Sequence, residues 1–393
     1  MNYFVSSSEN RGQKTLAIAD VSLFFHFPRR VRRCPYGSTM PELPEVESAR
    51  VLCETHCLGA TVTSVEFLED GTFDEKIFNG SDAKSFRKAL MGKTLLGTKR
   101  HGKHMWWDLG EKHDKGSKAK SHDTKSDMSP LFHFGMTGSM SIKGKDAMKY
   151  KSFKVDTESW PPRFAKLVVA WDNGASLAYT DPRRFGKIKL LKGCVTEQPP
   201  ISQLGFDPLL NMPDFKAFAE KFLKRAAPIK AVLLDQKIAA GVGNWIADEI
   251  LWLSKVHPET PAKDLSTATL GVIREKMAEI VKVACESNAE SSLFPSDWLF
   301  HSRWGKVAGN MNGSKIEFIT VGGRTTAFVP AVQRKDGIKK EVVKAEKTEA
   351  KKRSAEVEVK TPPKKAKKAP PAKVKAQVKA EKPTVKKTTR KLR

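Results

Sequence analysis

The stretch that decides the interpretation of this chain is Pro41-Glu42-Leu43-Pro44-Glu45-Val46-Glu47, which follows Met40. If translation begins at Met40, aminopeptidase removes that methionine because the next residue is small, and Pro41 becomes a free secondary amine. An α-amine titrates near about pH 7.7–8.0, so much of it is unprotonated when a lysine is charged. Such an amine can attack the anomeric carbon of a deoxyribose and leave an iminium, as in Schiff-base catalysis. Pro41 is therefore a candidate nucleophile.

The same stretch also has the features of a helix start. Pro44 suits the first helical position, and Glu45 and Glu47 suit the positive end of the helix dipole. We expect a helix from Glu45 to Cys57. The catalytic and the structural interpretations of the stretch are compatible with each other.

The charge of the 393-residue chain is unevenly distributed. Its net charge is +26, but residues 334–393 alone carry 23 basic against 7 acidic side chains, and residues 1–39 carry 6 against 2. The middle of the chain is therefore only mildly basic, and attraction to a polyanion such as nucleic acid is concentrated in the C-terminal arm. That arm is rich in Lys, Ala, Pro and Val and is predicted to be disordered.

The five cysteines do not form a disulfide or zinc framework. Their number is odd and none is part of a C-x-x-C pair, which indicates a reducing compartment. Cys53 and Cys57 share one face of the expected helix, where they are either buried small apolar residues or a metal-binding pair. The chain has no apolar run of the roughly 18 residues needed to span a bilayer, so we expect no membrane association.

We predict an α+β chain with an N-terminal β-sandwich or barrel-like domain and a helical second domain. Short alternating segments separated by Gly, Asp and Asn turns run from Ala60 to Leu191 and indicate strands. Four helical segments follow, and two alternating runs around Gly322-Gly323 predict a hairpin. The predicted divisions are a leader or transit-like extension (1–39), a β-sandwich domain (40–192) with a polar inserted loop (111–129), a linker (193–213), a helical domain (214–290), a hairpin finger (291–333) and a basic tail (334–393).

Several segments match, in order, the motifs of one family. They are PELPEVE, the basic segment Lys99–His104, His133-Phe134-Gly135-Met136-Thr137-Gly138, Tyr179-Thr180-Asp181-Pro182-Arg183-Arg184-Phe185-Gly186, and Gly241-Val242-Gly243-Asn244 between two helical runs. Together they resemble the formamidopyrimidine-DNA glycosylases and their endonuclease VIII relatives, over roughly Met40 to Pro330. The chain has no cysteine after Cys285, so the finger resembles the zincless type of plants and fungi, and we expect no zinc and no cofactor.

The resemblance implies roles for residues around the reacting sugar. Pro41 would be the nucleophile, Glu42 would transfer a proton to the sugar ring or leaving group, and Lys103 would contact the phosphate next to the sugar. Glu45 is a candidate contact of the flipped base. Met136 would fill the gap that the flipped base leaves in the stack, which suits an unbranched apolar side chain.

The resemblance also implies roles in holding the duplex. Arg183 would reach the estranged base opposite the lesion, and Phe185 would wedge beside it. Lys230, Asn244 and Arg324 would contact phosphates, with Asn244 at an N-cap position where capping is its alternative role. The helical domain would be a helix-two-turn-helix domain.

The predicted function is that of a monomeric, bifunctional DNA glycosylase and abasic-site lyase of base excision repair. Its partner is double-stranded DNA that contains oxidised bases or abasic sites, with oxidised purines such as 8-oxoguanine and formamidopyrimidines as substrates. Oxidised pyrimidines and hydantoins are an alternative. A second alternative is a non-catalytic DNA- or chromatin-binding protein, which would follow if residues 1–39 stay attached and Pro41 remains an amide. The Lys-rich tail predicts a nuclear location, and residues 1–39, read as a transit peptide, predict a chloroplast or mitochondrion.

Overall fold

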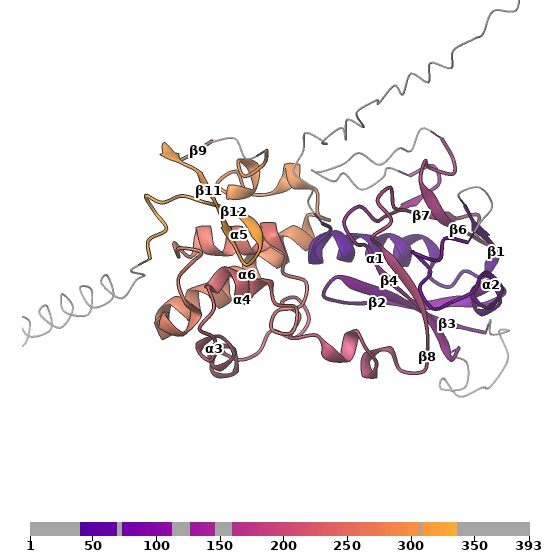
Figure 1. Ribbon diagram of the computed structural model, residues 1–393. Coiled ribbons are helices and arrows are strands. Elements are labelled where there is room, and N and C mark those ends of the chain that lie inside the picture. Colours follow the sequence, from indigo (N-terminus) through magenta and orange to yellow (C-terminus); the bar gives the residue numbers. More distant parts are fainter. Residues whose placement is uncertain (1–39, 69–72, 112–125, 146–158, 306–308, 336–393) are drawn as a thin grey trace, which may run out of the picture. The chain divides into compact units, whose positions relative to one another are not determined.

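The computed structural model describes residues 40–68, 73–111, 126–145, 159–305 and 309–335 (Figure 1). The predicted leader (1–39), most of the polar insertion and the basic tail from residue 336 lie outside the described residues. Among the residues that are described, no helix is both long enough and apolar enough to cross a membrane.

The predicted first helix is present as α1 (Leu43–Cys57). Its apolar side chains serve two different cores. Leu43 is part of the core of the helical domain, whereas Val46, Ala49 and Cys53 pack in the core between the sheets. Spacings of three and four residues place these three on one helix face. The helix therefore joins the two halves of the protein, with the PELPEVE stretch at the junction.

Two four-stranded antiparallel sheets form the N-terminal domain, and both contribute apolar side chains to one core. The predicted sandwich is confirmed, and the barrel-like alternative is wrong because the sheets remain separate. α2 (Ala83–Leu90) packs beside the first sheet. The first sheet has the order β1 (Val62–Phe67), β6 (Ala165–Trp171), β7 (Ser176–Thr180), β5 (Ser139–Ile142), and the second β2 (Thr94–His101), β3 (His104–Gly110), β4 (Met128–His133), β8 (Lys187–Lys192).

The helical domain and the hairpin follow the predicted order. The helices are α3 (Phe215–Leu223), α4 (Ile229–Leu234), α5 (Asn244–Leu253) and α6 (Thr267–Glu286), with five short 3-10 helices at Val195–Glu197, Ile201–Gln203, Ala262–Asp264, Ser291–Leu293 and Leu299–His301. The hairpin pairs β11 (Glu317–Val321) with β12 (Arg324–Phe328) around Gly322 and Gly323. A smaller hairpin, β9 (Asn310–Met311) with β10 (Ser314–Lys315), precedes it. Trp252 of α5 packs with Ala327 and Val329, which docks the main hairpin on the helices.

Two predicted boundaries differ from the structure. The insertion predicted for 111–129 ends earlier, because Met128 and Ser129 already pair with β8. The segment predicted as a linker (193–213) also belongs in part to the helical domain. Phe206 is in its hydrophobic core and pairs with Ala239, so the chain is fixed to the helices well before α3.

A buried ion pair ties the two domains together at this segment. Arg100 of β2 and Asp207 are both fully buried and paired. The Asp207 carboxylate also accepts the backbone N–H of Gly102 at 2.7 Å, and Arg100 donates to Glu47 of α1 at 2.7 Å. These contacts leave the charged groups satisfied, which is the condition for burying them.

We predict that Asp207→Ala destabilises the protein by about 3–5 kcal/mol, because it removes one of the two carboxylates that pair with the buried Arg100 guanidinium and the acceptor of the Gly102 N–H. Urea unfolding measures this change. The isosteric Asp207→Asn should cost less, because an amide oxygen still accepts the Gly102 N–H. Equal stability of wild type and the Ala variant would contradict the proposed role of this pair.

Candidate active site

The carboxylate of Glu42 is held by the N-terminus of α5. Glu42 is buried, and its two oxygens accept the backbone N–H groups of Trp245 at 2.9 Å and Ile246 at 3.2 Å. The first N–H groups of a helix have no partner within the helix and carry the positive end of its dipole. An acid at the start of α1 therefore supplies the acceptors for the first N–H groups of α5, a helix more than two hundred residues later in the sequence.

Glycines allow this close approach. A Cβ atom on Gly243 would overlap the Glu42 carboxyl group, and one on Gly241, whose φ is +94°, would lie 2.7 Å from the Leu43 side chain. At Gly102 an added Cβ atom would lie 2.9 Å from the Cβ atom of Ala240, so a side chain there has no room either. The glycines of the Gly241–Asn244 turn thus let the backbone approach Glu42 and Leu43.

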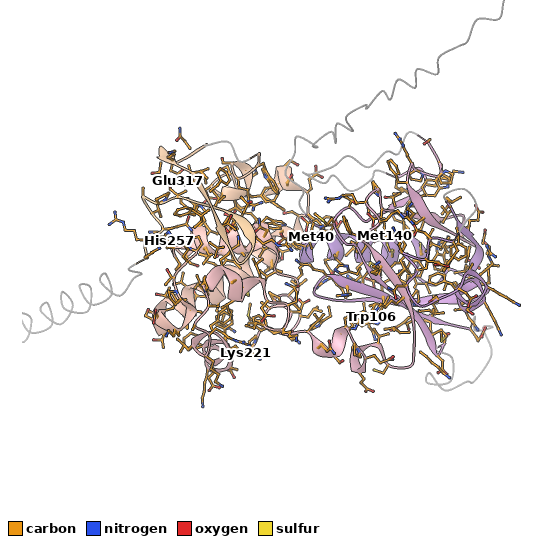
Figure 2. All side chains as sticks on the ribbon, viewed as in Figure 1. Met40, Trp106, Met140, Lys221, His257 and Glu317 are labelled. Carbon is orange, nitrogen blue, oxygen red and sulfur yellow. The ribbon has the colours of Figure 1, made fainter. Side chains whose placement is uncertain are left out.

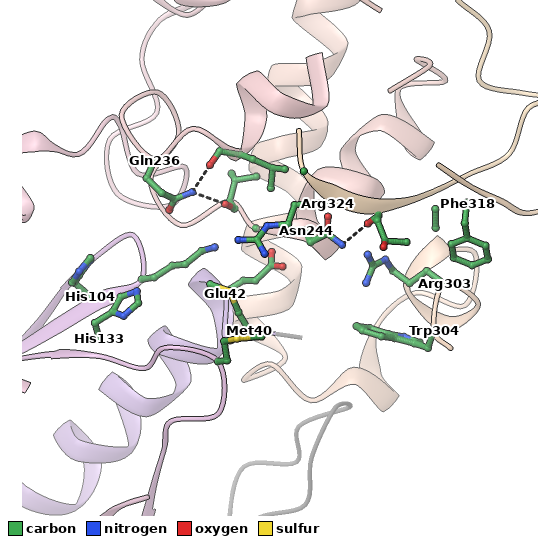
Figure 3. Close-up of a pocket in the computed structure, with 18 of the residues that line it drawn as sticks. Met40, Glu42, His104, His133, Gln236, Asn244, Arg303, Trp304, Phe318 and Arg324 are labelled. Carbon is green, nitrogen blue, oxygen red and sulfur yellow. Dashed lines mark hydrogen bonds between the residues drawn. The ribbon is translucent and has the colours of Figure 1, made fainter. Parts of the chain in front are cut away.

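A pocket of about 460 Å3 opens beside Glu42 between the second sheet, the helices and the hairpin (Figure 3). Five of the predicted site residues line it, and they come from segments far apart in the sequence. Figure 3 shows Met40 next to Glu42, with Arg303 and Arg324 on the other side of the acid. The five residues are Glu42, Lys103, Met136, Asn244 and Arg324.

The lining charges make the pocket suited to an anion. Lys103, Arg303 and Arg324 face it together with one acid, Glu42. Burial raises the pKa of Glu42, although the nearby Lys103 opposes this, and burial lowers the pKa of Lys103. A carboxyl group with a raised pKa retains its proton closer to neutral pH, which is the property required of a proton donor.

Glu45 lies directly behind Glu42 and is part of the same acidic pair. Its carboxylate accepts the backbone N–H of Glu42 at 2.9 Å. Burial, and then the charge of Glu42, raise the pKa of Glu45 to about 7. Glu45 is not among the residues that line the pocket, so it supports the backbone of Glu42 at the entrance to α1.

Two histidines on the pocket wall were missed by our reading of the sequence. His104 and His133 stand opposite each other on β3 and β4, with ring centroids 4.7 Å apart. Burial lowers the pKa of His104 to about 3 and that of His133 to about 4, so both are neutral. Both belong to motifs that we quoted, but only the strand pairing shows that they meet.

Met136 lies on a loop that is fastened to the loop of Arg183 and Phe185. The buried carboxylate of Asp181 accepts the Thr137 hydroxyl at 2.5 Å, the Arg183 N–H at 3.3 Å and the Gly186 N–H at 2.7 Å. Arg183 and Phe185 are exposed and form a cation–π pair at 5.1 Å. The structure thus brings these predicted residues together beside the pocket, although only Met136 lines it.

Asn244 is placed one position away from the predicted N-cap. Gly243 caps α5, and Asn244 is its first residue. The Asn244 side-chain amide donates to the Thr325 carbonyl at 2.8 Å, next to Arg324 at the exposed start of β12. Asn244 therefore fixes the hairpin against the helix at the pocket wall.

The expectation that Lys230 contacts a phosphate does not fit the structure. Lys230 is fully buried, and its ammonium group pairs with Asp248 of α5. Asp248 also accepts from Arg303 at 2.6 Å and from the Ala327 N–H at 3.2 Å. A buried lysine needs such a partner. Asp248, which our reading of the sequence did not identify, therefore links α4, Arg303 and the hairpin.

The cysteines Cys53 and Cys57 lie in the core of the sandwich. Burial raises the pKa of Cys57 to about 12 and that of Cys53 well above its ordinary value. They therefore act as small apolar residues. In the part of the chain that the structure describes, no group of three or more His, Cys, Asp and Glu side chains is arranged to hold a metal, and the predicted absence of zinc stays a prediction for metal analysis.

Comparison with known proteins agrees with the architecture of this site. Residues 40–188 match the formamidopyrimidine-DNA glycosylase N-terminal domain, residues 204–296 its H2TH domain, and residues 298–330 the formamidopyrimidine-DNA glycosylase-like C-terminal domain. The chain is 40% identical over 316 residues to formamidopyrimidine-DNA glycosylase of Arabidopsis thaliana, covering 80% of this chain and 75% of that protein. It is 29% identical over 306 residues to the enzyme of that name from Ligilactobacillus salivarius, covering 75% and 99%.

Solved structures with the same fold include DNA complexes. The Lactococcus lactis protein bound to DNA containing N7-benzyl-Fapy-dG superposes with a TM-score of 0.58 at 27% identity, covering 75% of this chain and 100% of that one. Its complex with abasic-site DNA gives the same TM-score and identity, covering 75% and 99%. The matched segments of this chain are thus the N-terminal, H2TH and C-terminal domains of one class of DNA glycosylase. The chain belongs to the formamidopyrimidine-DNA glycosylase family.

We predict that Gly243→Ala destabilises the protein by about 1–3 kcal/mol, because the added methyl group overlaps the Glu42 carboxyl group in a packed site. Thermal or urea unfolding measures this change. Gly97→Ala is the matched control, because nothing lies within 4 Å of a Cβ atom at that position. If both substitutions have the same small effect, the contact between Gly243 and Glu42 is not a packing constraint.

We also predict that Glu45 makes stability depend on pH between its ordinary pKa of 4.5 and its folded value of about 7. The folded protein retains this proton longer than the unfolded chain does. The stabilising contribution is therefore complete below pH 4.5, declines as pH rises, and is lost above pH 7. Compared with Glu45→Gln, the free energy of unfolding of the wild type should fall by on the order of 3 kcal/mol across this pH range. Parallel pH profiles of unfolding free energy for the two proteins would exclude this coupling.

Proposed function

We propose that this protein is a bifunctional DNA glycosylase and abasic-site lyase of base excision repair that acts on duplex DNA containing oxidised purines. The observation that carries the proposal is the placement of Glu42 at a cationic pocket formed by both domains and the hairpin. Pro41 is buried and does not itself line the pocket, but both of its neighbours in the sequence, Met40 and Glu42, do. Met40 lines the pocket, and the family match begins at this residue. Removal of Met40 and the residues before it would leave the Pro41 amine at the pocket.

The chemistry follows from these groups. A damaged base cannot be reached within the stack, so the nucleotide must first be extruded into the pocket. The lone pair of the Pro41 nitrogen then attacks C1′, and the base leaves with the electrons of the glycosidic bond and takes up the proton that the nitrogen loses. Opening of the sugar ring forms the iminium, and O4′ takes up the proton that Glu42 supplies. Loss of a C2′ proton next expels the 3′ phosphate, and δ-elimination expels the 5′ phosphate.

Contacts around the pocket support the handling of the duplex. Lys103 and Arg324 line the pocket, and both are cationic side chains that would neutralise phosphates there. Met136, on the loop held by Asp181, would occupy the gap that the extruded base leaves in the stack. Arg183 and Phe185 would contact the strand opposite the lesion. Oxidised pyrimidines and hydantoins are the second candidate substrate class, because attack of the Pro41 amine on C1′ can release these bases as well.

We further propose a nuclear location for the protein. The support is the lysine cluster in Thr361-Pro-Pro-Lys-Lys-Ala-Lys-Lys, which has the composition of an import signal. Import into a chloroplast or mitochondrion through residues 1–39 is the competing proposal. Fluorescent fusions that lack either residues 1–39 or residues 334–393 distinguish the two.

The function is tested by single-turnover kinetics on an 8-oxoguanine duplex and on an abasic duplex. Glu42→Gln should reduce base release at least a hundredfold, the lower end of the usual effect of a general acid, with duplex affinity little changed. Glu66→Gln, at an exposed position on β1, should leave release unchanged. A protein forced to retain residues 1–39 should nick neither duplex. Equal turnover by the extended and the Pro41-initiated proteins would exclude the proposed amine.

Deleting residues 334–393 should weaken general DNA affinity without affecting the chemistry. This segment carries 23 basic against 7 acidic side chains, and each neutralised phosphate contributes roughly 0.9 to the slope of log affinity against log salt. The truncated protein should therefore show a shallower salt slope, with unchanged single-turnover base release at saturating enzyme. Loss of that release would place the tail in the active site.

A further inference from the structure

A second Arg–Phe pair, not assigned any role above, lies next to Arg183 and Phe185. The guanidinium carbon of Arg163 is 4.6 Å from the centroid of the Phe164 ring. Phe164 is 39% exposed, compared with 51% for Phe185. Among the described residues, none of the hydrophobic clusters includes Phe164. Within the described part of the chain, the ring therefore belongs to no apolar core, and more than a third of the residue is open to solvent.

Strand pairing places this pair at the same end of the sheet as the other two DNA-facing loops. Thr180, at the end of β7, pairs with Ala165 of β6 on one side and with Ser139 of β5 on the other. Neighbouring strands are about 4.8 Å apart. Proceeding outward from the pocket, the order is the Met136 loop, the loop of Arg183 and Phe185, and then Arg163 and Phe164.

A backbone hydrogen bond connects the second pair to Asp181, the residue that also holds the other two loops. The backbone N–H of Asp181 donates to the Phe164 carbonyl at 3.1 Å. The Asp181 side chain fastens the two other loops, as described above. One residue thus sets the relative positions of all three loops, so they present their side chains as a single rigid edge.

The backbone of Phe164 is strained. Its φ is +66°, a left-handed conformation that is an outlier for a bulky residue. Glycine adopts this conformation without steric cost. Backbone strain of this kind is concentrated at functional sites, where the surrounding structure holds it in place. An exposed aromatic ring at a position that favours glycine indicates that the ring is needed for an interaction outside the fold.

We propose that Arg163 and Phe164 form a third DNA-contacting element, which binds the strand opposite the lesion. Phe164 packs its ring on a nucleotide that flanks the estranged base, as exposed aromatic rings do on unstacked nucleotides. Arg163 neutralises the phosphate of that nucleotide. This inference rests on the proposed function, because it requires a lesion-containing duplex in the pocket.

Photo-crosslinking locates the contact of Phe164. The full-length protein carrying p-benzoylphenylalanine at position 164 is irradiated with a duplex that contains an uncleavable abasic-site analogue, each strand bearing a different label. Crosslinking to the strand opposite the analogue is expected. The same photoreactive residue at position 215, a phenylalanine of α3 that is 41% exposed, is the control and should give little product. Crosslinking of position 164 to the lesion strand only, or to neither strand, would overturn the proposal.

A thermodynamic cycle tests the contact of Arg163. One phosphate at a time in the opposite strand is replaced by an uncharged methylphosphonate. One such replacement should weaken binding by wild type but not by Arg163→Gln, and the variant should lower the salt slope by about 0.9. Lys84→Gln, at an exposed position on α2, should leave the slope unchanged. If every methylphosphonate weakens wild type and Arg163→Gln equally, the assigned phosphate contact is wrong.

Phe164→Gly separates this contact from a structural role. The variant should melt at a temperature at least equal to that of wild type, because glycine relieves the strain, and it should bind the analogue duplex more weakly. A lower melting temperature with unchanged affinity would assign the ring to the fold and overturn the proposal. Wild-type protein that fails to bind the analogue duplex would instead refute the proposed function itself.

Discussion

The structure depends on one interaction, the binding of the Glu42 carboxylate by the first N–H groups of α5. It gives hydrogen-bond acceptors to the first N–H groups of the helix and hydrogen-bond donors to a buried acid. The N-terminal and helical domains therefore each supply polar partners that the other needs. It also constrains the sequence on both sides. Gly241 and Gly243 have no space for a side chain, because the PELPEVE stretch lies against them.

At three other positions, too, a buried carboxylate holds segments together that are far apart in the sequence. Asp207 ties β2 to the start of the helical domain, Asp181 fastens the loops at the end of β7, and Asp248 links α4 and Arg303 to the hairpin. In each case the oxygens accept several donors, which compensates for their removal from water. The pocket-lining side chains are therefore positioned by buried ionic groups that lie behind them.

Features that depend on local pattern were predictable from the sequence. The helix-start residues Pro44, Glu45 and Glu47 predicted α1, alternation predicted the strands of the sandwich, and Gly322-Gly323 predicted the turn between β11 and β12. Motif resemblance brought Glu42, Lys103, Met136, Asn244 and Arg324 to one site, and the structure places them around one pocket. Local pattern carries this information because helical and strand periodicities are properties of neighbouring residues.

Features that depend on tertiary partners were not predictable. Motif resemblance assigned Lys230 to a phosphate, but its burial follows from its pairing with Asp248, eighteen positions later and one helix away. The rings of His104 and His133 meet only because β3 pairs with β4 in one register. The closeness of Gly243 to Glu42 required the docking of two domains, which no local pattern specifies.

We propose the amine of Pro41, adjacent to the helix-bound Glu42, as the nucleophile. Borohydride reduction of the covalent intermediate on lesion-containing DNA, followed by mass-spectrometric mapping of the modified peptide, identifies the attacking atom. We expect the active protein to begin at Pro41 and the sugar to be attached to its nitrogen. Attachment to a lysine such as Lys103, or a trapped adduct on a chain that still carries residues 1–39, would contradict this proposal.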